Sequence, residues 1–254
     1  MNKVKLALSA GLVLATTFTF SCSSDDEGGG GNENGGGGSV TYEGQTYKTV
    51  KIGTQTWLAK NLNNAVAGSK CYDNDPANCD KYGRLYDWAT AMALPPGCNE
   101  NSCSSQIQSK HRGICPSGWH IPSNDDWDVL MNYVGGYETA GTKLKARSGW
   151  DENGNGTDQH GFSALPGGCL GYWEDDCPDE DPSGSCENLS GSGFYEIGNW
   201  GLWWSATEGE GDDHSPRAYY RFMFSDYDDY YSNSYVRSDS EVKEMMISIR
   251  CLKD

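Results

Sequence analysis

Residues 115–136 read CPSGWHIPSNDDWDVLMNYVGG and contain the clearest local signal of structure in the chain. Ser123 is a good N-cap for a helix, and Asp126, three residues later, completes a short-armed capping box. The apolar side chains that follow recur at helical spacing and form one stripe, until the pair Gly135-Gly136 ends the pattern. The sequence therefore predicts an amphipathic helix that begins after Ser123 and ends before Gly135.

Shorter signals on both sides of this helix indicate a mixed domain. The β-prone runs Thr46–Ile52 and Gln55–Leu58 predict an N-terminal hairpin or meander, and apolar spacing predicts a helix near residues 84–93. Later strands are expected at Phe162–Leu165, Phe194–Ile197, Leu202–Ala206, Ala218–Phe224 and Met246–Cys251. Because the helices come early and most of the strands late, the predicted class is α+β rather than alternating βαβ units.

The composition limits the function. The chain has 254 residues with 36 acidic and 19 basic side chains, a net charge of −17. Nucleic-acid binding depends on basic side chains that neutralise phosphates, so a DNA or RNA partner is disfavoured. No apolar run reaches the roughly 18 residues of a membrane-spanning helix, which argues against a polytopic membrane protein.

The beginning of the chain predicts export and anchoring. Lys3 and Lys5 precede an apolar stretch, Leu6–Phe20, that is too short to span a bilayer, and a small residue then precedes Cys22. This layout predicts a signal peptide over residues 1–21. Its end resembles a bacterial lipoprotein signal, which implies that Cys22 is lipidated and becomes the new N-terminus. An ordinary signal peptide followed by an incidental cysteine is the alternative.

Residues 22–39 have the composition of an acidic, glycine-rich tether. Ser23–Glu27 resembles the acidic export tag of surface lipoproteins in Bacteroides-type bacteria, and residues 28–38 include eight glycines. Segments this rich in glycine bury little and behave as flexible linkers. We therefore expect an outer-membrane lipoprotein, exposed at the cell surface, whose single domain spans residues 40–254.

Motifs distributed over residues 40–254 resemble the Fibrobacter succinogenes major paralogous domain. They are Trp57–Leu62, Lys81–Tyr86, Cys115–Ser123, Gly161–Gly168 and Ile249–Asp254. That family consists largely of secreted or surface proteins and lipoproteins without an established activity. More distantly, Trp119–Ser123 and Trp203–Thr207 are similar to the formylglycine-generating enzymes, a branch of the C-type-lectin-like fold. This resemblance implies two helices flanking a small, twisted, mostly antiparallel sheet, with long disulfide-stapled loops that carry the site.

Nine cysteines remain beyond Cys22, and in an oxidising compartment we expect disulfides. The preferred local pairs are Cys71–Cys79, Cys98–Cys103 and Cys177–Cys186. A bridge between Cys115 and Cys251 is also preferred, because closing so long a loop removes unfolded-state entropy worth about 4–5 kcal/mol. Cys169 is then left over as a candidate free thiol, and its pairing with Cys177 or Cys186 is an open alternative.

An aromatic and acidic stretch late in the chain is the candidate ligand-binding surface. Six of the fifteen tyrosines lie within Tyr219–Tyr235. Sugar surfaces need flat aromatic faces for stacking and carboxylates for hydroxyl groups. The candidate residues are Asp226, Tyr227, Asp228, Tyr230 and Tyr231, together with the upstream Trp203 and Trp204. The alternative is that the tryptophans belong to the core and the tyrosines only decorate a loop.

Residues 151–158 carry oxygen-bearing side chains at alternating positions, with glycine at the sixth, like the start of an EF-hand loop. The candidate calcium ligands are Asp151, Asn153, Asn155, Thr157 and Asp158. The twelfth position is Phe162 instead of the bidentate glutamate, so a glycine-rich turn is the favoured interpretation. Calcium is a possible cofactor, and no other cofactor is expected.

The leading interpretation is a surface domain that binds an extracellular glycan or protein ligand without catalysis. A structural or assembly component of a cell-surface complex is the alternative. A third interpretation is an enzyme of the formylglycine-generating type. The resemblance would then require a reactive cysteine pair late in the chain, where Cys251 is the only late cysteine. For His120, at the start of the predicted helix, a packing or capping role is favoured over catalysis.

Overall fold

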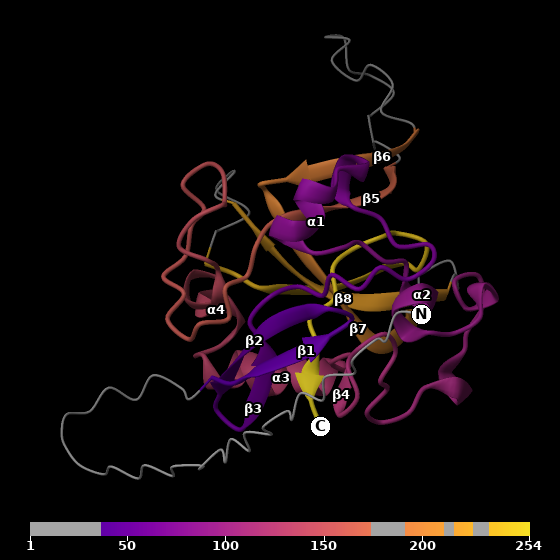
Figure 1. The fold of residues 1–254 in the computed structure, drawn as a ribbon, viewed down its shortest axis with the longest axis horizontal. Helices are drawn as coiled ribbons and strands as arrows, with labels where there is room; N and C mark the ends of the chain where they lie inside the picture. The colour runs from indigo at the N-terminus through magenta and orange to yellow at the C-terminus, as the bar shows by residue number, and fades with distance from the viewer. Residues whose placement is uncertain (1–36, 174–190, 211–215, 226–233) are drawn as a thin grey trace, which may run out of the picture. The chain divides into compact units, whose positions relative to one another are not determined.

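The computed structural model describes residues 37–173, 191–210, 216–225 and 234–254, and it combines α-helices with mostly antiparallel sheets (Figure 1). The predicted mixture of helices and antiparallel strands is thus confirmed. The α-helices are α1 (Pro76–Tyr82), α2 (Trp88–Met92), α3 (Asn124–Tyr133) and α4 (Tyr137–Leu144), and short 3-10 helices lie at Tyr72–Asn74, Pro96–Cys98 and Ser104–Gln106. Within the described ranges, every helix is too short or too polar to cross a membrane.

One sheet joins early strands to the last strand of the chain. Its order is β1-β2-β3-β10-β4, with β1 at Ser39–Tyr42, β2 at Gln45–Ile52, β3 at Gln55–Leu58, β4 at Trp119–His120 and β10 at Leu252–Lys253. Strands β2 and β3 confirm the predicted hairpin, and they pair antiparallel. Leu252 pairs with Trp57 on one side and with His120 on the other. In Figure 1 the yellow strand β10 accordingly lies beside the indigo strands.

Two further sheets hold the late strands. One pairs β5 (Gly167–Trp173) with β6 (Gly191–Ile197), and the other has the order β7-β8-β9, at Trp200–Glu210, Pro216–Phe224 and Arg237–Val242. The predicted strands at 194–197, 202–206 and 218–224 are confirmed as parts of β6, β7 and β8. Side chains alternate across β8, so that Tyr220 and Phe222 stack on one face while Arg221 and Met223 point to the other.

The helix predicted after Ser123 is confirmed as α3, and its capping box is formed. Ser123 Oγ accepts a hydrogen bond from Asp126 N at 3.3 Å, and Asp126 Oδ2 accepts one from Ser123 N at 2.9 Å. These two bonds satisfy donors that the first helical turn leaves open. Local sequence chemistry therefore decides where this helix begins.

Other predicted elements differ from the structure. The helix expected near 84–93 is the shorter α2, because Tyr86 N donates to Ile247 O at 2.9 Å and its backbone is held in a bridge. The strand predicted at 162–165 is wrong, since Ala164 forms only an isolated bridge with Lys145. The strand predicted at 246–251 is wrong for the same reason, since its residues form isolated bridges and β10 starts at Leu252.

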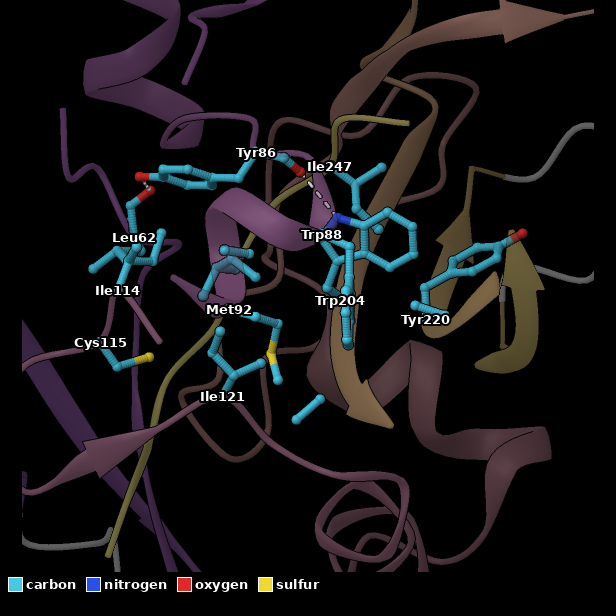
Figure 2. Packing of buried hydrophobic residues seen from close by; sticks show 14 of the residues in the cluster. Leu62, Tyr86, Trp88, Met92, Ile114, Cys115, Ile121, Trp204, Tyr220 and Ile247 are labelled. Carbon is cyan, nitrogen blue, oxygen red and sulfur yellow. Dashed lines mark hydrogen bonds between the residues drawn. The ribbon is translucent and has the colours of Figure 1, made fainter. Parts of the chain in front are cut away.

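Buried aromatic side chains dominate the core (Figure 2). One cluster surrounds α2 and includes Trp88, Trp204 and Ile247. Trp204 Nε1 donates to Tyr86 O at 2.9 Å, and Trp88 Nε1 donates to Ser205 O at 2.9 Å. A second cluster packs α3 and α4 against β7 and β8 through Trp127, Leu130, Leu144, Trp203 and Met223. The indole N–H groups of Trp88, Trp203 and Trp204 are paired, so these three rings are buried without an unsatisfied donor. Trp127 Nε1 has no hydrogen-bond partner among the described residues.

Residues from four of the quoted motifs meet in one buried polar network. Arg250 is fully buried, and its Nη2 and Nε donate to Asn61 Oδ1 at 2.7 and 3.1 Å. Trp203 Nε1 donates to the same oxygen at 2.8 Å, and Arg250 Nη1 donates to Phe162 O at 2.6 Å. Burial lowers the pKa of Arg250 to about 9, so the guanidinium keeps its charge at neutral pH. These motif residues therefore specify the core, where an unpartnered charge would be costly.

Disulfides join Cys71 to Cys79, Cys98 to Cys103 and Cys115 to Cys251, which confirms these three pairs predicted from the sequence. The last bridge connects positions 136 residues apart. The fourth preferred pair, Cys177–Cys186, lies outside the described residues. Cys169 is buried in β5, with its Sγ 3.9 Å from the carbonyl oxygen of Tyr195.

Candidate functional site

Most of the predicted binding residues lie outside the described residues. They are Asp226, Tyr227, Asp228, Tyr230 and Tyr231, which follow β8 and precede β9 in the sequence. The predicted lipid anchor Cys22 also lies outside the described part of the chain. These assignments stay predictions.

The two tryptophans of the predicted binding set are buried and do not lie at the surface. Trp203 and Trp204 are both 0% exposed, so neither ring face is open to a ligand. Alternation along β7 directs Trp203 to the Asn61 network and Trp204 to the backbone of Tyr86. The structure therefore places both residues in the core and not on a binding surface.

The candidate calcium ligands lie in the loop between α4 and β5. This set comprises Asp151, Asn153, Asn155, Thr157 and Asp158. The carboxylate of Asp158 accepts hydrogen bonds from N and Oγ of Ser163 at 2.8 and 2.7 Å, and Asn155 Oδ1 accepts one from Trp150 N at 3.1 Å. Across the described residues, no group of three or more His, Cys, Asp or Glu side chains is placed to hold a metal. The loop is closed by its own side chains, as in a glycine-rich turn.

A hollow of about 350 Å³ lies at the start of α4 and the first residues of β9. We call it the Tyr137 hollow; its lining is Tyr137, Phe222, Val236, Arg237, Ser238 and Asp239. The lining strands β8 and β9 are the two that flank the predicted tyrosine segment in the sequence. The hollow thus offers an aromatic ring, a hydroxyl group and charges of both signs in one place.

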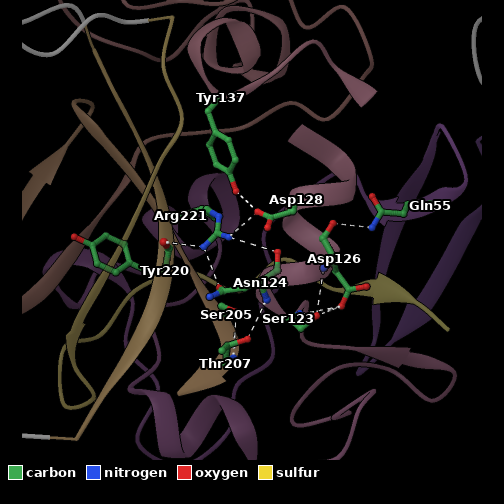
Figure 3. Close-up of polar contacts among 10 residues, drawn as sticks. All are labelled: Gln55, Ser123, Asn124, Asp126, Asp128, Tyr137, Ser205, Thr207, Tyr220 and Arg221. Atoms are coloured by element: carbon green, nitrogen blue, oxygen red, sulfur yellow. Dashed lines mark hydrogen bonds and ion pairs between the residues drawn. The ribbon is translucent and has the colours of Figure 1, made fainter. Parts of the chain in front are cut away.

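A buried arginine holds the wall of this hollow (Figure 3). Arg221 is 2% exposed; its Nη1 donates to Asn124 Oδ1 at 3.1 Å, and its Nη2 lies 3.4 Å from Asp128 Oδ1. The Tyr137 hydroxyl donates to the same Asp128 oxygen, and the Arg221 guanidinium carbon lies 5.9 Å from the centroid of the Tyr137 ring. The ring is therefore held by contacts from both α3 and β8, and its orientation is set before any ligand arrives.

Local sequence explains this arrangement. Asn124 and Asp128 are one helical turn apart on α3, so both face the same side of the helix. Thr207 Oγ1 accepts a hydrogen bond from Asn124 N at 3.0 Å, which ties the start of α3 to β7 (Figure 3). Gly136 precedes Tyr137 with φ at +93°, a conformation that favours glycine and lets α4 begin directly after α3.

The Tyr137 hydroxyl is protonated at neutral pH and can therefore donate a hydrogen bond. Burial raises the pKa of its hydroxyl, the hydrogen bond to Asp128 raises it further, and Arg221 opposes both. Because the net shift of the pKa is upward, the hydroxyl keeps its proton at neutral pH. Arg221 Nε has no hydrogen-bond partner among the described residues, while Asp128 is 52% exposed. Arg221 is buried and therefore holds Tyr137 from behind, while the Tyr137 ring lines the hollow and supplies a flat apolar face.

Neither Tyr137 nor Arg221 is among the site residues predicted from the sequence. One signal was available for Arg221, because a lone arginine inside the apolar run Ala218–Phe224 requires partners if the strand is buried. No local pattern distinguishes Tyr137 from the other tyrosines. Its role depends on Asp128 and Arg221, which belong to other elements.

A comparison with protein families finds that a family model described as the Fibrobacter succinogenes major domain matches residues 50–253. No curated protein and no solved structure matches the chain.

Proposed function

The chain belongs to the Fibrobacter succinogenes major domain family, and from that premise we propose that it is a non-catalytic, surface-exposed lipoprotein domain that binds an extracellular glycan. The proposed ligand site is the Tyr137 hollow. The tyrosine segment Asp226–Tyr231 is proposed to extend the site, because it connects the two strands that line the hollow.

The anchoring part of this proposal comes from the sequence. A basic start and a short apolar stretch support a signal peptide over residues 1–21, and the position of Cys22 supports lipidation. The acidic, glycine-rich residues 22–39 support a tether that holds the domain away from the outer membrane. In this location the partners are outer-membrane lipid at Cys22 and a ligand outside the cell.

We further propose that the fold is C-type-lectin-like. In support, β10 pairs between β3 and β4, so that the two ends of the domain share one sheet. Helices α3 and α4 also pack on β7 and β8 through a common apolar cluster. A lectin-like fold would place the specificity of the protein in its long loops.

The observation that carries the glycan proposal is that contacts within the protein fix the orientation of the Tyr137 ring and that polar side chains line the same hollow. Saccharides present an apolar ring face and a rim of hydroxyl groups, so they are held by stacking together with bidentate polar contacts. Tyr137 offers the face, while Ser238, Asp239 and Arg237 line the same hollow. Fixing the ring in advance reduces the side-chain entropy lost on binding.

A glycan array tests the proposal with the wild-type protein, Tyr137→Ala, Tyr137→Phe and the matched control Tyr133→Ala. Tyr133 is 58% exposed on α3 and does not line the hollow. We expect Tyr137→Ala to lose about tenfold in affinity for the best glycan, equivalent to about 1.4 kcal/mol. Tyr137→Phe keeps the ring but loses its tie to Asp128, so we expect an intermediate loss. Tyr133→Ala should bind like the wild type.

Two further arms complete this experiment. A variant with Tyr227, Tyr230 and Tyr231 replaced by Ala tests the proposed extension of the site. A calcium chelator tests whether residues 151–158 bind a cation that the ligand requires. If the wild type binds no glycan, or if Tyr137→Ala and Tyr133→Ala bind equally well, the glycan proposal is wrong. Capture of a surface protein in place of a glycan would then favour the assembly role.

A further inference from the structure

A second and larger hollow, of about 640 Å³, surrounds the Cys71–Cys79 disulfide. We call it the Cys71 hollow; its lining is Glu43, Gln45, Asn63, Asn64, Ala65, Ser69, Lys70, Cys71, Asn74, Pro76, Cys79, Asp80 and Arg84. This lining contains amide side chains and charges but no aromatic ring. It shares no residue with the Tyr137 hollow.

The frame of the Cys71 hollow is rigid. Lys70 and Leu85 form an antiparallel bridge, with Lys70 N donating to Leu85 O at 3.0 Å and Leu85 N donating to Lys70 O at 2.9 Å. Arg84 N donates to Leu62 O at 3.0 Å, and the disulfide ties Cys71 to α1. A ligand would therefore meet side chains whose backbone is already fixed, which lowers the entropy lost on binding.

Arg84 is a polar side chain of this hollow that keeps unused hydrogen-bond donors. Its Nε donates to Ser69 Oγ at 2.8 Å and its Nη2 to Ser69 O at 3.4 Å, while its Nη1 lies 3.5 Å from the sulfur atoms of the disulfide. A guanidinium has five N–H donors, and sulfur is a weak acceptor. Both η nitrogens thus keep donor capacity, and together they present the fork that matches a carboxylate.

The charge of Arg84 is also unmatched. In the part of the chain that the structure describes, Arg84 forms no ion pair with a carboxylate. This is notable in a chain with 36 acidic and 19 basic side chains, where carboxylates are abundant. Arg84 is half-buried, and the exposed Lys70 adds a second positive charge to the lining. A half-buried guanidinium that has no carboxylate partner can bind an anion, because its N–H groups donate charge-assisted hydrogen bonds.

The rest of the lining limits which anion fits. Glu43 and Asp80 are exposed and also line the hollow, so a multiply charged anion would meet repulsion there. Gln45, Asn63 and Asn74 offer amide donors and acceptors that suit hydroxyl groups. The preferred ligand has one carboxylate and several hydroxyl groups. We propose that the Cys71 hollow binds a uronic acid residue, with its carboxylate on the Arg84 guanidinium.

Isothermal titration calorimetry of the purified protein with glucuronate tests this proposal, with glucose as the neutral counterpart. We expect glucuronate to bind and glucose to bind at least about tenfold more weakly, because only the former places a charge on Arg84. Arg84→Gln should lose about tenfold or more in affinity for glucuronate. Lys70→Gln should lose a smaller factor, and raising the salt concentration should reduce the difference between Lys70→Gln and the wild type.

Arg147→Gln is the matched control, because Arg147 is exposed, lines neither hollow and carries the same charge. It should bind glucuronate like the wild type. If Arg84→Gln does not fold, which circular dichroism would show, the exposed Lys70→Gln decides the question. Equal binding of glucuronate and glucose, or full glucuronate affinity in the folded Arg84→Gln variant, would overturn the proposal. Because the two hollows share no residue, Tyr137→Ala should leave glucuronate binding intact, and failure of either proposal is separately visible.

Discussion

His120 is a buried side chain held between two carboxylates from distant parts of the chain. Its Nδ1 lies 2.7 Å from Asp254 Oδ1, and its Nε2 lies 3.5 Å from Asp126 Oδ2. Burial lowers the pKa of His120, but the nearby carboxylates of Asp126 and Asp254 outweigh it, and the pKa is raised above its ordinary value. Folding therefore favours the protonated imidazole. From β4, His120 thus links the cap of α3 to Asp254, the residue that follows β10.

The stabilising contribution of His120 should depend on pH. A raised folded-state pKa means that the contribution is fully present below the unfolded pKa of about 6.5 and is lost as the pH rises through the folded pKa. We expect the gap in unfolding free energy between wild type and His120→Gln to shrink over that window by about 1 kcal/mol at most, since Asp254 is 45% exposed. Urea unfolding between about pH 5.5 and 8.5 measures it.

His160→Gln is the control for this pH series. Burial and the nearby Lys143 lower the pKa of His160, so its protonation on acidification destabilises the fold. Removing that histidine should therefore help stability below about pH 6.5, the opposite trend. A gap for His120→Gln that is constant across the pH range would contradict the assignment.

For a single residue such as His120, the sequence predicts the kind of role that the side chain has, but it does not predict which residue the side chain contacts. A packing or capping role for His120 follows from its position just before Ser123. The contact with Asp254 does not, because it bridges 134 positions and exists only once β10 has paired with β4. The same holds for Arg84, whose neighbours are set by the Cys71–Cys79 loop.

At the scale of elements, β9 is an edge strand that is protected by its own side chains. Among the strands of the described ranges it pairs only with β8, in the sheet order β7-β8-β9. Ser240 N donates to Asp239 Oδ1 at 2.7 Å, and Val242 N donates to Glu241 Oε1 at 2.8 Å. These two backbone donors are therefore occupied, and the carboxylates add charge at the edge. Both features oppose pairing with a strand of another molecule.

Removing this protection should promote self-association. We expect the double variant Asp239→Ala/Glu241→Ala to form dimers and larger species at concentrations at which the wild type does not. The substitutions free two backbone N–H donors for pairing with another strand, and they remove the negative charge at the edge. Analytical ultracentrifugation over a concentration series measures this. Glu138→Ala/Glu244→Ala removes the same charge at exposed positions outside the strands and should behave like the wild type. Equal association of both variants would show that net charge alone matters.

Elements with local signals were predictable, and elements that depend on partners were not. Helix α3 carries its start and stop in its own residues, and the sequence locates both. Strand β9 reads RSDSEV, which has no apolar alternation, and it is a strand because β8 offers a partner. Conversely, Phe162–Leu165 looks like a strand, but among the described residues it forms only the isolated bridge between Ala164 and Lys145. The Tyr137 hollow needs contacts from α3, α4, β8 and β9, so no single stretch of sequence reveals it.

At the scale of the molecule, the bridge between Cys115 and Cys251 closes the longest loop among the disulfides of the described residues. Both half-cystines are fully buried. This bridge was predicted because closing so long a loop removes much of the entropy of the unfolded chain. The order of the sheet that it stabilises was not, because β10 is only two residues long and carries little pattern of its own.

Loss of the long bridge should cost more stability than loss of a local one. In the chain-entropy treatment, Cys115→Ala/Cys251→Ala should lower the unfolding free energy by about 5 kcal/mol, and Cys98→Ala/Cys103→Ala by about 2 kcal/mol. Both bridges are buried, so the cavity terms are comparable. Reversible urea unfolding of the two double variants measures the difference. If both variants lose the same free energy, loop closure is not the source of the stabilisation.

The placement of β10 between β3 and β4 governs when the molecule can fold. A ribosome adds Leu252 about two hundred positions after Trp57, yet these residues are neighbours in one sheet. Strand β3 therefore keeps an open side until almost all later residues are available for folding. Nascent chains stopped before Leu252 should lack the closed sheet, and its completion is a late, single event in the life of each molecule.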